Sequence, residues 1–313
     1  MAVDYLHFCI KRFCFVIKIN YYACFQNSGT VQIMTINEIK TVIEKIFPLA
    51  KNEIADNEIK IVLEDFLEHL NNGTIRAAEK INDNWQVNKW VKQGILLLFQ
   101  IGKLKEISKN EENYFFDKDT LPLKKIELKN SIRLVPGGSA IRSGAYVAAG
   151  VVCMPPMYIN IGAYVDAGTM VDSHALVGTC AQIGKNVHIS AAAQIGGVLE
   201  PIGANPVIIE DNVMIGGNCG IYEGVIVKKN AILGSGVILN SSTKIYDLVN
   251  EKIIVSTVEN PLVIPENAVI VQGARGVNSD FGRANNLSIA TPLIVKYRDS
   301  KTDAKTELEN ALR

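Results

Sequence analysis

A repeat of six residues constrains the fold of this 313-residue chain more than any other feature. Every sixth position from Val135 to Ile195 belongs to one series of eleven residues, of which ten are Val or Ile and the remaining one is Cys153. The series resumes at Ile209 and runs by sixes to Ile245. Such self-similarity at a short fixed period is typical of a solenoid, in which each repeat packs only against its neighbours.

A second series marks the turns between the repeats. Three residues before most of the apolar positions stands a small or turn-forming residue, beginning with Gly138 in the first stretch and with Asn212 in the second. Ile195 and Ile209 are fourteen residues apart, which is not a multiple of six. We therefore expect the segment around 200–206 to bulge outward as a loop.

The six-residue period predicts the shape of the fold. Six residues are enough for a short strand and one sharp turn, with the apolar residue pointing inward and glycine or asparagine supplying the unusual backbone angle of the corner. Three such flats close one triangular coil of about eighteen residues, so about 110 residues give roughly six coils. We predict a mainly β protein with a parallel β-helix over residues 132–270.

The chain before the repeat reads as a small, mostly helical domain over 34–117. Thr35 and Glu38 fit a capping box, and the apolar positions that follow form one helical stripe. A second stripe over 59–70 ends at Asn71 to Gly73, and a short strand pair and a helix are expected over 75–87 and 88–101. We expect a polar connector over 118–131 and a C-terminal β and helical segment over 271–313.

Residues 1–33 differ from the rest of the chain in composition. They hold seven of the twenty Phe and Tyr residues and three of the six cysteines. Their longest uncharged run before Lys18 is too short for a secretory or membrane-spanning segment. We interpret 1–33 as a non-native or wrongly assigned extension of the natural protein.

Charge and cysteine content exclude several classes of function. The 32 basic and 32 acidic side chains balance, so no overall field would attract nucleic acid or an anionic membrane surface. The cysteines are scattered without a CxxC pair, which indicates a reducing compartment and therefore the cytoplasm. The repeat contains only His174 and His188, fourteen residues apart, which does not fit a three-histidine zinc site, and we expect no metal.

Several segments resemble one family of enzymes built on this repeat. They are Tyr158 to Lys185, IRLVP at 132–136, GGVLEP at 196–201 and DAKT at 303–306. The chain from about Met34 to Arg313 is similar to the tetrahydrodipicolinate N-succinyltransferases, which are hexapeptide-repeat acyltransferases. The resemblance implies a left-handed β-helix and a cytosolic homotrimer. It also implies transfer of a succinyl group from succinyl-CoA to the amino group of ring-opened tetrahydrodipicolinate, on the route to diaminopimelate and lysine. Residues 1–33 have no counterpart in the resemblance.

Two residues carry the implied acceptor site. Arg133 is similar to the family arginine that binds a carboxylate of the acceptor, and a guanidinium suits that task. Asp172 follows the inward-pointing Val171, so it is expected to point outward, and the resemblance gives it the contact with the acceptor's amino group. The structural alternatives are a solvated arginine at a domain junction and a corner aspartate that binds turn amides, as Asp166 is expected to do.

Other candidates rest on weaker arguments. Glu223 is a second candidate catalytic acid, because the resemblance places the family's second functional acid near it, although Gly220 stands where some members have a glutamate. Arg142 is a candidate for the acceptor's other carboxylate, and Lys305 for the phosphates of CoA. His174 occupies the corner series, so a structural or groove-lining role is at least as good an interpretation as that of a general base.

A solid three-sided rod has no interior for a ligand, so sites are expected in grooves between neighbouring subunits. No cysteine or serine comes with a recognisable base, so direct transfer without an acyl-enzyme is expected. Two alternatives remain open at this point. One is another CoA-dependent N-acyltransferase, with an acetyl donor or an amino-sugar acceptor, and the other is a β-helix scaffold without chemistry.

Overall fold

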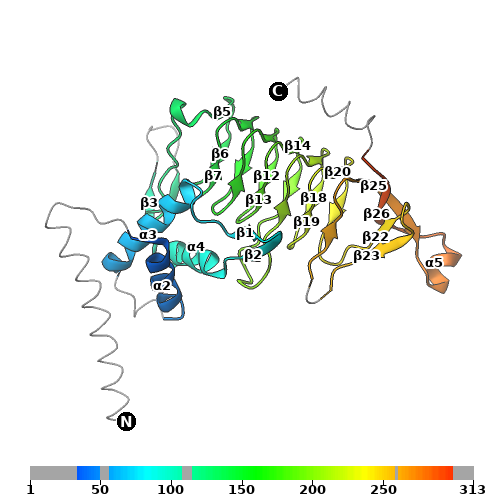
Figure 1. Cartoon of the computed structure of the whole chain (residues 1–313), viewed down its shortest axis with the longest axis horizontal. Coiled ribbons are helices and arrows are strands. Elements are labelled where there is room, and N and C mark those ends of the chain that lie inside the picture. Colours follow the sequence, from blue (N-terminus) through cyan, green and yellow to red (C-terminus); the bar gives the residue numbers. More distant parts are fainter. Residues whose placement is uncertain (1–33, 50–55, 108–114, 258–259, 299–313) are drawn as a thin grey trace, which may run out of the picture.

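The computed structural model describes residues 34–49, 56–107, 115–257 and 260–298. Figure 1 shows three parts in sequence order: a helical N-terminal part, a long three-sided rod, and a β-hairpin that projects from the far end of the rod. The predictions made for residues 1–33 lie outside the described residues.

Among the described residues, the N-terminal part contains three helices and a hairpin. Helix α2 spans Ile36–Ile46, α3 spans Asp56–Asn71 and α4 spans Lys89–Ile101, while strands β1 (Ala78–Ile81) and β2 (Asn84–Val87) form the hairpin. The predicted capping box is confirmed, because the Glu38 N–H donates to Thr35 Oγ1 and the Thr35 N–H donates to the Glu38 carboxylate. The predicted apolar stripe of α3 is buried along its whole length.

Short elements link this part to the rod. Strands β3 (Leu104–Glu106) and β4 (Phe116–Lys118) pair with each other in antiparallel fashion, and the short 3-10 helix η2 spans Leu128–Asn130. The division at 117 and 131 stays a prediction.

The rod consists of three parallel sheets, which we name the first, second and third faces. The first face contains β5 (Arg133–Leu134), β8 (Val152–Cys153), β11 (Met170–Val171), β14 (His188–Ile189), β17 (Met214–Ile215), β20 (Ile232–Leu233) and β25 (Ala268–Gly276). The second contains β6 (Ala140–Ile141), β9 (Tyr158–Ile159), β12 (Leu176–Val177), β15 (Gln194–Ile195), β18 (Gly220–Ile221) and β21 (Ile238–Leu239). The third contains β7 (Tyr146–Val147), β10 (Tyr164–Val165), β13 (Gln182–Ile183), β16 (Ile208–Ile209), β19 (Ile226–Val227) and β24 (Val263–Ile264).

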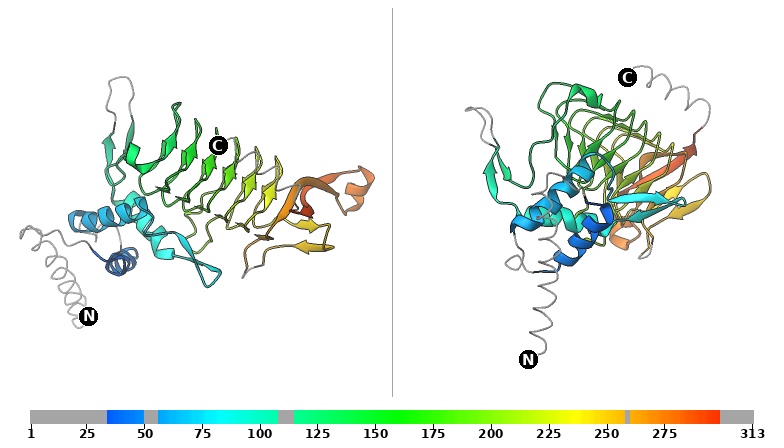
Figure 2. Two further views of the ribbon diagram at one scale, coloured as in Figure 1. Left: turned by 45° about the horizontal axis from the view of Figure 1, so that its top comes forward. Right: turned by 60° about the vertical axis from the view of Figure 1, so that its left-hand side comes forward.

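The parallel β-helix predicted from the repeat is confirmed. Each strand pairs with the strand eighteen residues or more away, for example Val165 with Ile183, and consecutive strands lie on successive faces (Figure 2). The second residue of nearly every strand is buried, and together these residues form one continuous core. Each buried Val or Ile contributes about 1.5–3 kcal/mol before the loss of conformational entropy is subtracted.

Corner residues adopt the left-handed backbone that the turn series predicts. Asn186, Asn212, Asn230 and Asn267 occupy successive corners with φ between 53° and 62°. Their side chains form a ladder, in which each Nδ2 donates to the next Oδ1 over 3.1–3.3 Å. Asparagine tolerates this backbone and its amide can bond along the stack.

Two positions of the predicted repeat are wrong. In the first coil Leu134, not Val135, pairs with Cys153, so the step to Ile141 is seven residues, and the extra residue lies in the turn that contains Gly137 and Gly138. Ile245 begins β22 (Ile245–Asp247), which pairs with β23 (Lys252–Ile254) and with β26 (Ser288–Tyr297). The chain leaves the regular coil after β21 and returns to it at β24.

The C-terminal hairpin grows out of the last coil. Strand β25 pairs in parallel with β20 through its first residues and in antiparallel fashion with β26 along its length. Helix α5 (Asp280–Ala284) lies at the tip of the hairpin, far from the helical N-terminal part (Figure 1). The predicted boundary at 270 falls inside β25 and stays a prediction.

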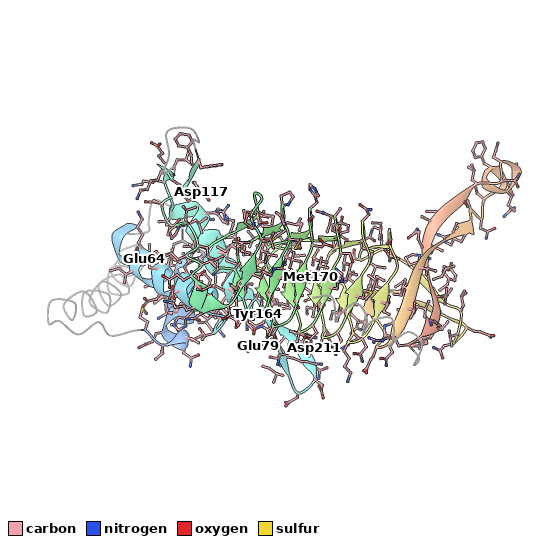
Figure 3. The ribbon with its side chains drawn as sticks, turned by 90° about the horizontal axis from the view of Figure 1, so that it is seen from above. Glu64, Glu79, Asp117, Tyr164, Met170 and Asp211 are labelled. Atoms are coloured by element: carbon pink, nitrogen blue, oxygen red, sulfur yellow. The ribbon has the colours of Figure 1, made fainter. Side chains whose placement is uncertain are left out.

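The N-terminal part packs on the third face. Ala78 forms a small buried cluster with Ile208 and Ile226. The Arg76 guanidinium stacks 3.6 Å from the centre of the Tyr164 ring, and its Nε donates to Gln182 Oε1 over 3.0 Å. Burial lowers the pKa of Arg76, although Tyr164 and the carboxylates of Asp166, Glu79 and Asp211 act against this (Figure 3). The third face is therefore occupied by the chain's own hairpin.

The loop predicted from the fourteen-residue spacing is confirmed between β15 and β16, and helix α4 holds it. Lys92 is fully buried and donates to the carbonyl of Ala204 in the loop. Burial lowers the pKa of Lys92.

Candidate active site on two edges of the rod

The turns of the rod form three edges, and the candidate residues lie on two of them. We name the edge between the first and second faces the first edge, and the edge between the second and third faces the second edge. The first edge carries the turns after β5, β8, β11, β14, β17 and β20, and the second edge carries those after β6, β9, β12, β15, β18 and β21.

Asp172 lies on the first edge, directly after β11. Its Oδ1 accepts the N–H of Ser173 over 2.7 Å, and its side chain is 31% exposed. Asp166 makes the same contact with the N–H of Ala167. Both aspartates therefore bind a turn amide, as the structural alternative expects, and this contact alone does not set Asp172 apart.

A histidine distinguishes the surroundings of Asp172. His188 Nε2 lies 3.9 Å from Asp172 Oδ2, and His188 is 8% exposed. From the sequence, we considered His188 only as a possible zinc ligand and did not predict its place beside Asp172. The signal was present, because His188 precedes the inward-pointing Ile189 and must therefore point outward one coil from Met170.

Arg133 lies on the same face as the strand that precedes Asp172. It pairs with Val152, which in turn pairs with Met170, so two strand spacings separate Arg133 from Met170. At about 4.8 Å for each spacing, their backbones are roughly 10 Å apart. Arg133 is exposed, and its side chain is long enough to share a ligand of several carbon atoms with Asp172.

Arg142 and Glu223 lie on the second edge. Arg142 donates to Asp117 over 2.5 Å, so a carboxylate of this chain already engages its guanidinium. Glu223 has a left-handed backbone (φ 47°) and accepts hydrogen bonds from the N–H and the hydroxyl of Ser241. β6 and β18 are four strands apart on their face, so one chain brings Arg142 and Glu223 neither to each other nor to Asp172.

The two remaining candidates contribute less. His174 is exposed at the corner of the first edge with φ 61°, as its place in the turn series predicts. Lys305 lies outside the described residues, so its role stays a prediction.

Past Asp172, the first edge is lined by small residues. They are Ser190, Ala191 and Ala192 after β14, Gly216 and Gly217 after β17, and Gly234, Ser235 and Gly236 after β20. Small side chains let an extended ligand approach the backbone closely. The left-handed φ of Gly236 (78°) agrees with the interpretation of these glycines as turn residues.

Comparisons with known proteins place the chain in a family. The family model "Tetrahydrodipicolinate N-succinyltransferase N-terminal" matches residues 38–101, and "Hexapeptide repeat of succinyl-transferase" matches 206–241. A 2,3,4,5-tetrahydropyridine-2,6-dicarboxylate N-succinyltransferase of Legionella pneumophila is 43% identical over 286 residues, which cover 88% of this chain and 98% of the relative. The enzyme of that name from Acinetobacter baylyi is 42% identical over 283 residues, with 88% and 99% covered. The chain belongs to this N-succinyltransferase family.

Membership in the N-succinyltransferase family agrees with the predicted left-handed twist of the β-helix. The family consists of acyl-transferring enzymes. Among solved structures, a candidate 2,3,4,5-tetrahydropyridine-2-carboxylate N-succinyltransferase from Campylobacter jejuni aligns with 16% identity and a TM-score of 0.38, covering 74% of this chain and 62% of that one.

The structure shows what fills the space at Gly220, where the sequence departs from some members of the N-succinyltransferase family. A Cβ on Gly220 would lie 2.5 Å from Cε2 and 2.8 Å from the hydroxyl of Tyr222. Tyr222 also covers Gly196 in the turn after the neighbouring strand β15. The phenol of Tyr222 therefore occupies the place where a side chain at 220 would stand.

Within residues 34–49, 56–107, 115–257 and 260–298, no group of three or more His, Cys, Asp or Glu side chains is arranged to hold a metal ion. None of the helices in the described segments combines the length and apolar character needed to cross a bilayer.

Proposed function

We propose that this chain transfers the succinyl group of succinyl-CoA to the amino group of ring-opened tetrahydrodipicolinate, a step toward diaminopimelate and lysine. The observation that carries the proposal is the 42–43% identity to relatives of that activity over 88% of the chain. The placement of Arg133 on the first face and of Asp172 on the adjoining first edge supports it, because the acceptor carries both carboxylates and an amine.

The transfer is direct, from thioester to amine. The ammonium of the acceptor first gives up one proton, and the neutral nitrogen then attacks the thioester carbonyl carbon to form an oxyanion. As the oxyanion collapses the C–S bond breaks, and a second proton passes from the nitrogen to the departing thiolate, so that CoA leaves as the thiol and the amide remains. The thiols of the chain are poorly suited to an acyl-enzyme: burial raises the pKa of Cys153 and of Cys180 to about 12, and that of Cys219 is raised as well. A thiolate, not a thiol, is the nucleophile, so these buried groups are inert.

Positioning supplies most of the rate enhancement. Asp172 orients the amine and stabilises its positive charge, and Arg133 binds one carboxylate of the acceptor through its guanidinium fork. We assign Arg142 to the acceptor's other carboxylate and Glu223 to the role of a second catalytic acid. Arg142 must exchange its contact with Asp117 for the ligand to fill this role.

The working unit is a cytoplasmic homotrimer with its sites between subunits. The separation of the candidates on two edges of one rod supports this arrangement, because the first edge of one subunit can face the second edge of another. The apolar side chains of the first and second faces, such as the 44% exposed Ile238, also favour contact with other subunits. CoA lies along the small residues of the first edge, with Lys305 at its phosphates, and no metal takes part.

A thiol-release assay tests the proposed function. The purified chain is incubated with tetrahydrodipicolinate and either succinyl-CoA or acetyl-CoA, and free CoA is measured. We expect release with succinyl-CoA that depends on the acceptor. Faster release with acetyl-CoA would instead identify an acetyltransferase, and release with neither donor would support a scaffold. Light scattering of the same sample measures the oligomeric state, and a monomer would contradict sites between subunits.

A further inference from the structure

Asp172 lies beside a buried histidine that the mechanism above does not use. His188 Nε2 is 3.9 Å from Asp172 Oδ2, while Oδ1 is held by the N–H of Ser173. The side chain of Asp172 is 31% exposed and that of His188 10%. A ligand that approaches along the first edge therefore reaches the carboxylate before it reaches the imidazole.

The place of His188 on the first face is otherwise suited to an apolar residue. Met170 and Met214 flank it in register, and Figure 3 labels Met170. Burying an imidazole between two methionines is unfavourable compared with burying a third methionine, unless the polar or charged ring interacts with a partner. The neighbouring carboxylate of Asp172 gives the ring a polar partner.

Few ionisable groups on the surrounding elements compete with Asp172. Among the described residues, β11 and the turn after it contribute Asp172 and the exposed His174, and β17 itself contributes none. The turns before these strands contribute Asp166, which accepts the N–H of Ala167, Glu210, which pairs with Lys228, and Asp211. The turn before β14 contributes the exposed Lys185, whose N–H donates to Asp211, and the turn after β14 (190–193) contributes none.

We propose that His188 is a positioning residue for Asp172. Its neutral imidazole keeps the carboxylate directed toward the groove, and its protonation weakens the hold of the carboxylate on the acceptor's amine. This inference rests on the proposed function, because it takes the group held by Asp172 to be the reacting amine.

The effect follows from the charges involved. The acceptor's amine arrives as an ammonium, which a carboxylate without a cationic partner attracts. An imidazolium 3.9 Å from that carboxylate neutralises its charge and repels the ammonium. Imidazole side chains ordinarily titrate at about pH 6.5, so such a switch acts within the physiological range.

The ratio of variant to wild-type activity isolates this effect. Values of kcat/KM for the acceptor are measured from pH 5.5 to 8.5 for the wild type and for His188→Gln, which keeps polarity but cannot acquire a charge. Ionisation of the acceptor itself is common to both enzymes and cancels in the ratio. We expect kcat/KM of the variant to be roughly tenfold lower at pH 8, and the variant-to-wild-type ratio to rise at least about threefold as the pH falls below 6.5.

His174→Gln is the matched control. It removes the other histidine of the rod from the same edge, and its ratio to the wild type should not depend on pH. A flat ratio for His188→Gln, or a pH-dependent ratio for His174→Gln alone, overturns the proposal. A wild type inactive at every pH refutes the proposed function and, with it, the role of His188.

A titration by NMR tests the pair without any activity. The chain has four histidines, so selective labelling gives few signals, and His188→Gln assigns one of them. In the Asp172→Asn protein, loss of the carboxylate should lower the titration midpoint of His188. An unchanged His188 midpoint overturns the proposal, and this measurement decides the question if the His188 variants are inactive.

Discussion

Gly178→Ala should destabilise the protein strongly, because the backbone of another coil lies where the new methyl group would stand. A Cβ on Gly178 would lie 2.2 Å from the nitrogen of Gly197 and 2.6 Å from the carbonyl carbon of Gly196. Ordinary contacts begin near 3.4 Å, so the two backbone segments must separate by about 1.2 Å. No flexible side chain is present at this contact to move aside.

The separation also strains two hydrogen bonds at the start of the loop. The Gly178 N–H donates to Ile195 over 2.8 Å, and the Val198 N–H donates to Thr179 over 3.1 Å. Overpacking of this kind costs about 1–3 kcal/mol, and each weakened buried hydrogen bond adds about 1 kcal/mol. We expect a loss of about 3 kcal/mol, which corresponds to a fall in Tm of about 6–12 °C.

Thermal and urea unfolding of the assembled protein measure the loss, with Gly203→Ala as the matched control. Gly203 lies in the same loop, has no neighbour within 4 Å of a new Cβ, and has no left-handed φ. Both substitutions restrict the unfolded chain equally, so their difference reports the folded-state clash. Gly203→Ala should change stability by less than about 0.5 kcal/mol. If Gly178→Ala costs no more than its control, the close contact between these two coils is wrong.

Three further predictions follow from single sites. Asp172→Ala should lose nearly all turnover while light scattering shows an intact oligomer, and activity retained within about tenfold would remove Asp172 from the mechanism. Burial raises the pKa of Cys153 and Cys180 to about 12, so mass spectrometry should find both unalkylated by iodoacetamide at pH 8 until the protein unfolds. The free energy of unfolding should fall as the pH rises above 9, because these thiols then ionise in the unfolded chain but not in the folded one. In urea unfolding, Asn212→Ala should lower the free energy of unfolding by about 1 kcal/mol more than Asn212→Gly does, because glycine adopts φ 58° without strain and alanine does not. Equal midpoints would contradict the strain at this corner.

The fold could be read from the sequence because its information is local. A strand and a corner together occupy six residues, so the anchors, the corners and the outward loop are all encoded within a few neighbouring positions. The helical stripes of α2 and α3 are local in the same way. The two errors arose where the period itself fails: the first turn has one extra residue before Ile141, and the chain leaves the coil after Leu239.

The candidate site depended on tertiary structure to a greater extent. Stacking of coils brings His188 to Asp172 and Tyr222 to Gly196, and strand β4 brings Asp117 to Arg142. None of these contacts lies within one repeat. They depend on side-chain direction and on the distance between coils, neither of which a six-residue period specifies.

By itself, then, the sequence determined a three-sided rod with an apolar axis, because each repeat satisfies its own hydrogen bonds and burial in the same way as the last. The tertiary structure decided which outward side chains meet. It put Arg133 and Asp172 on one side of the rod and Arg142 and Glu223 on another edge, since the number of strands between two residues sets their separation.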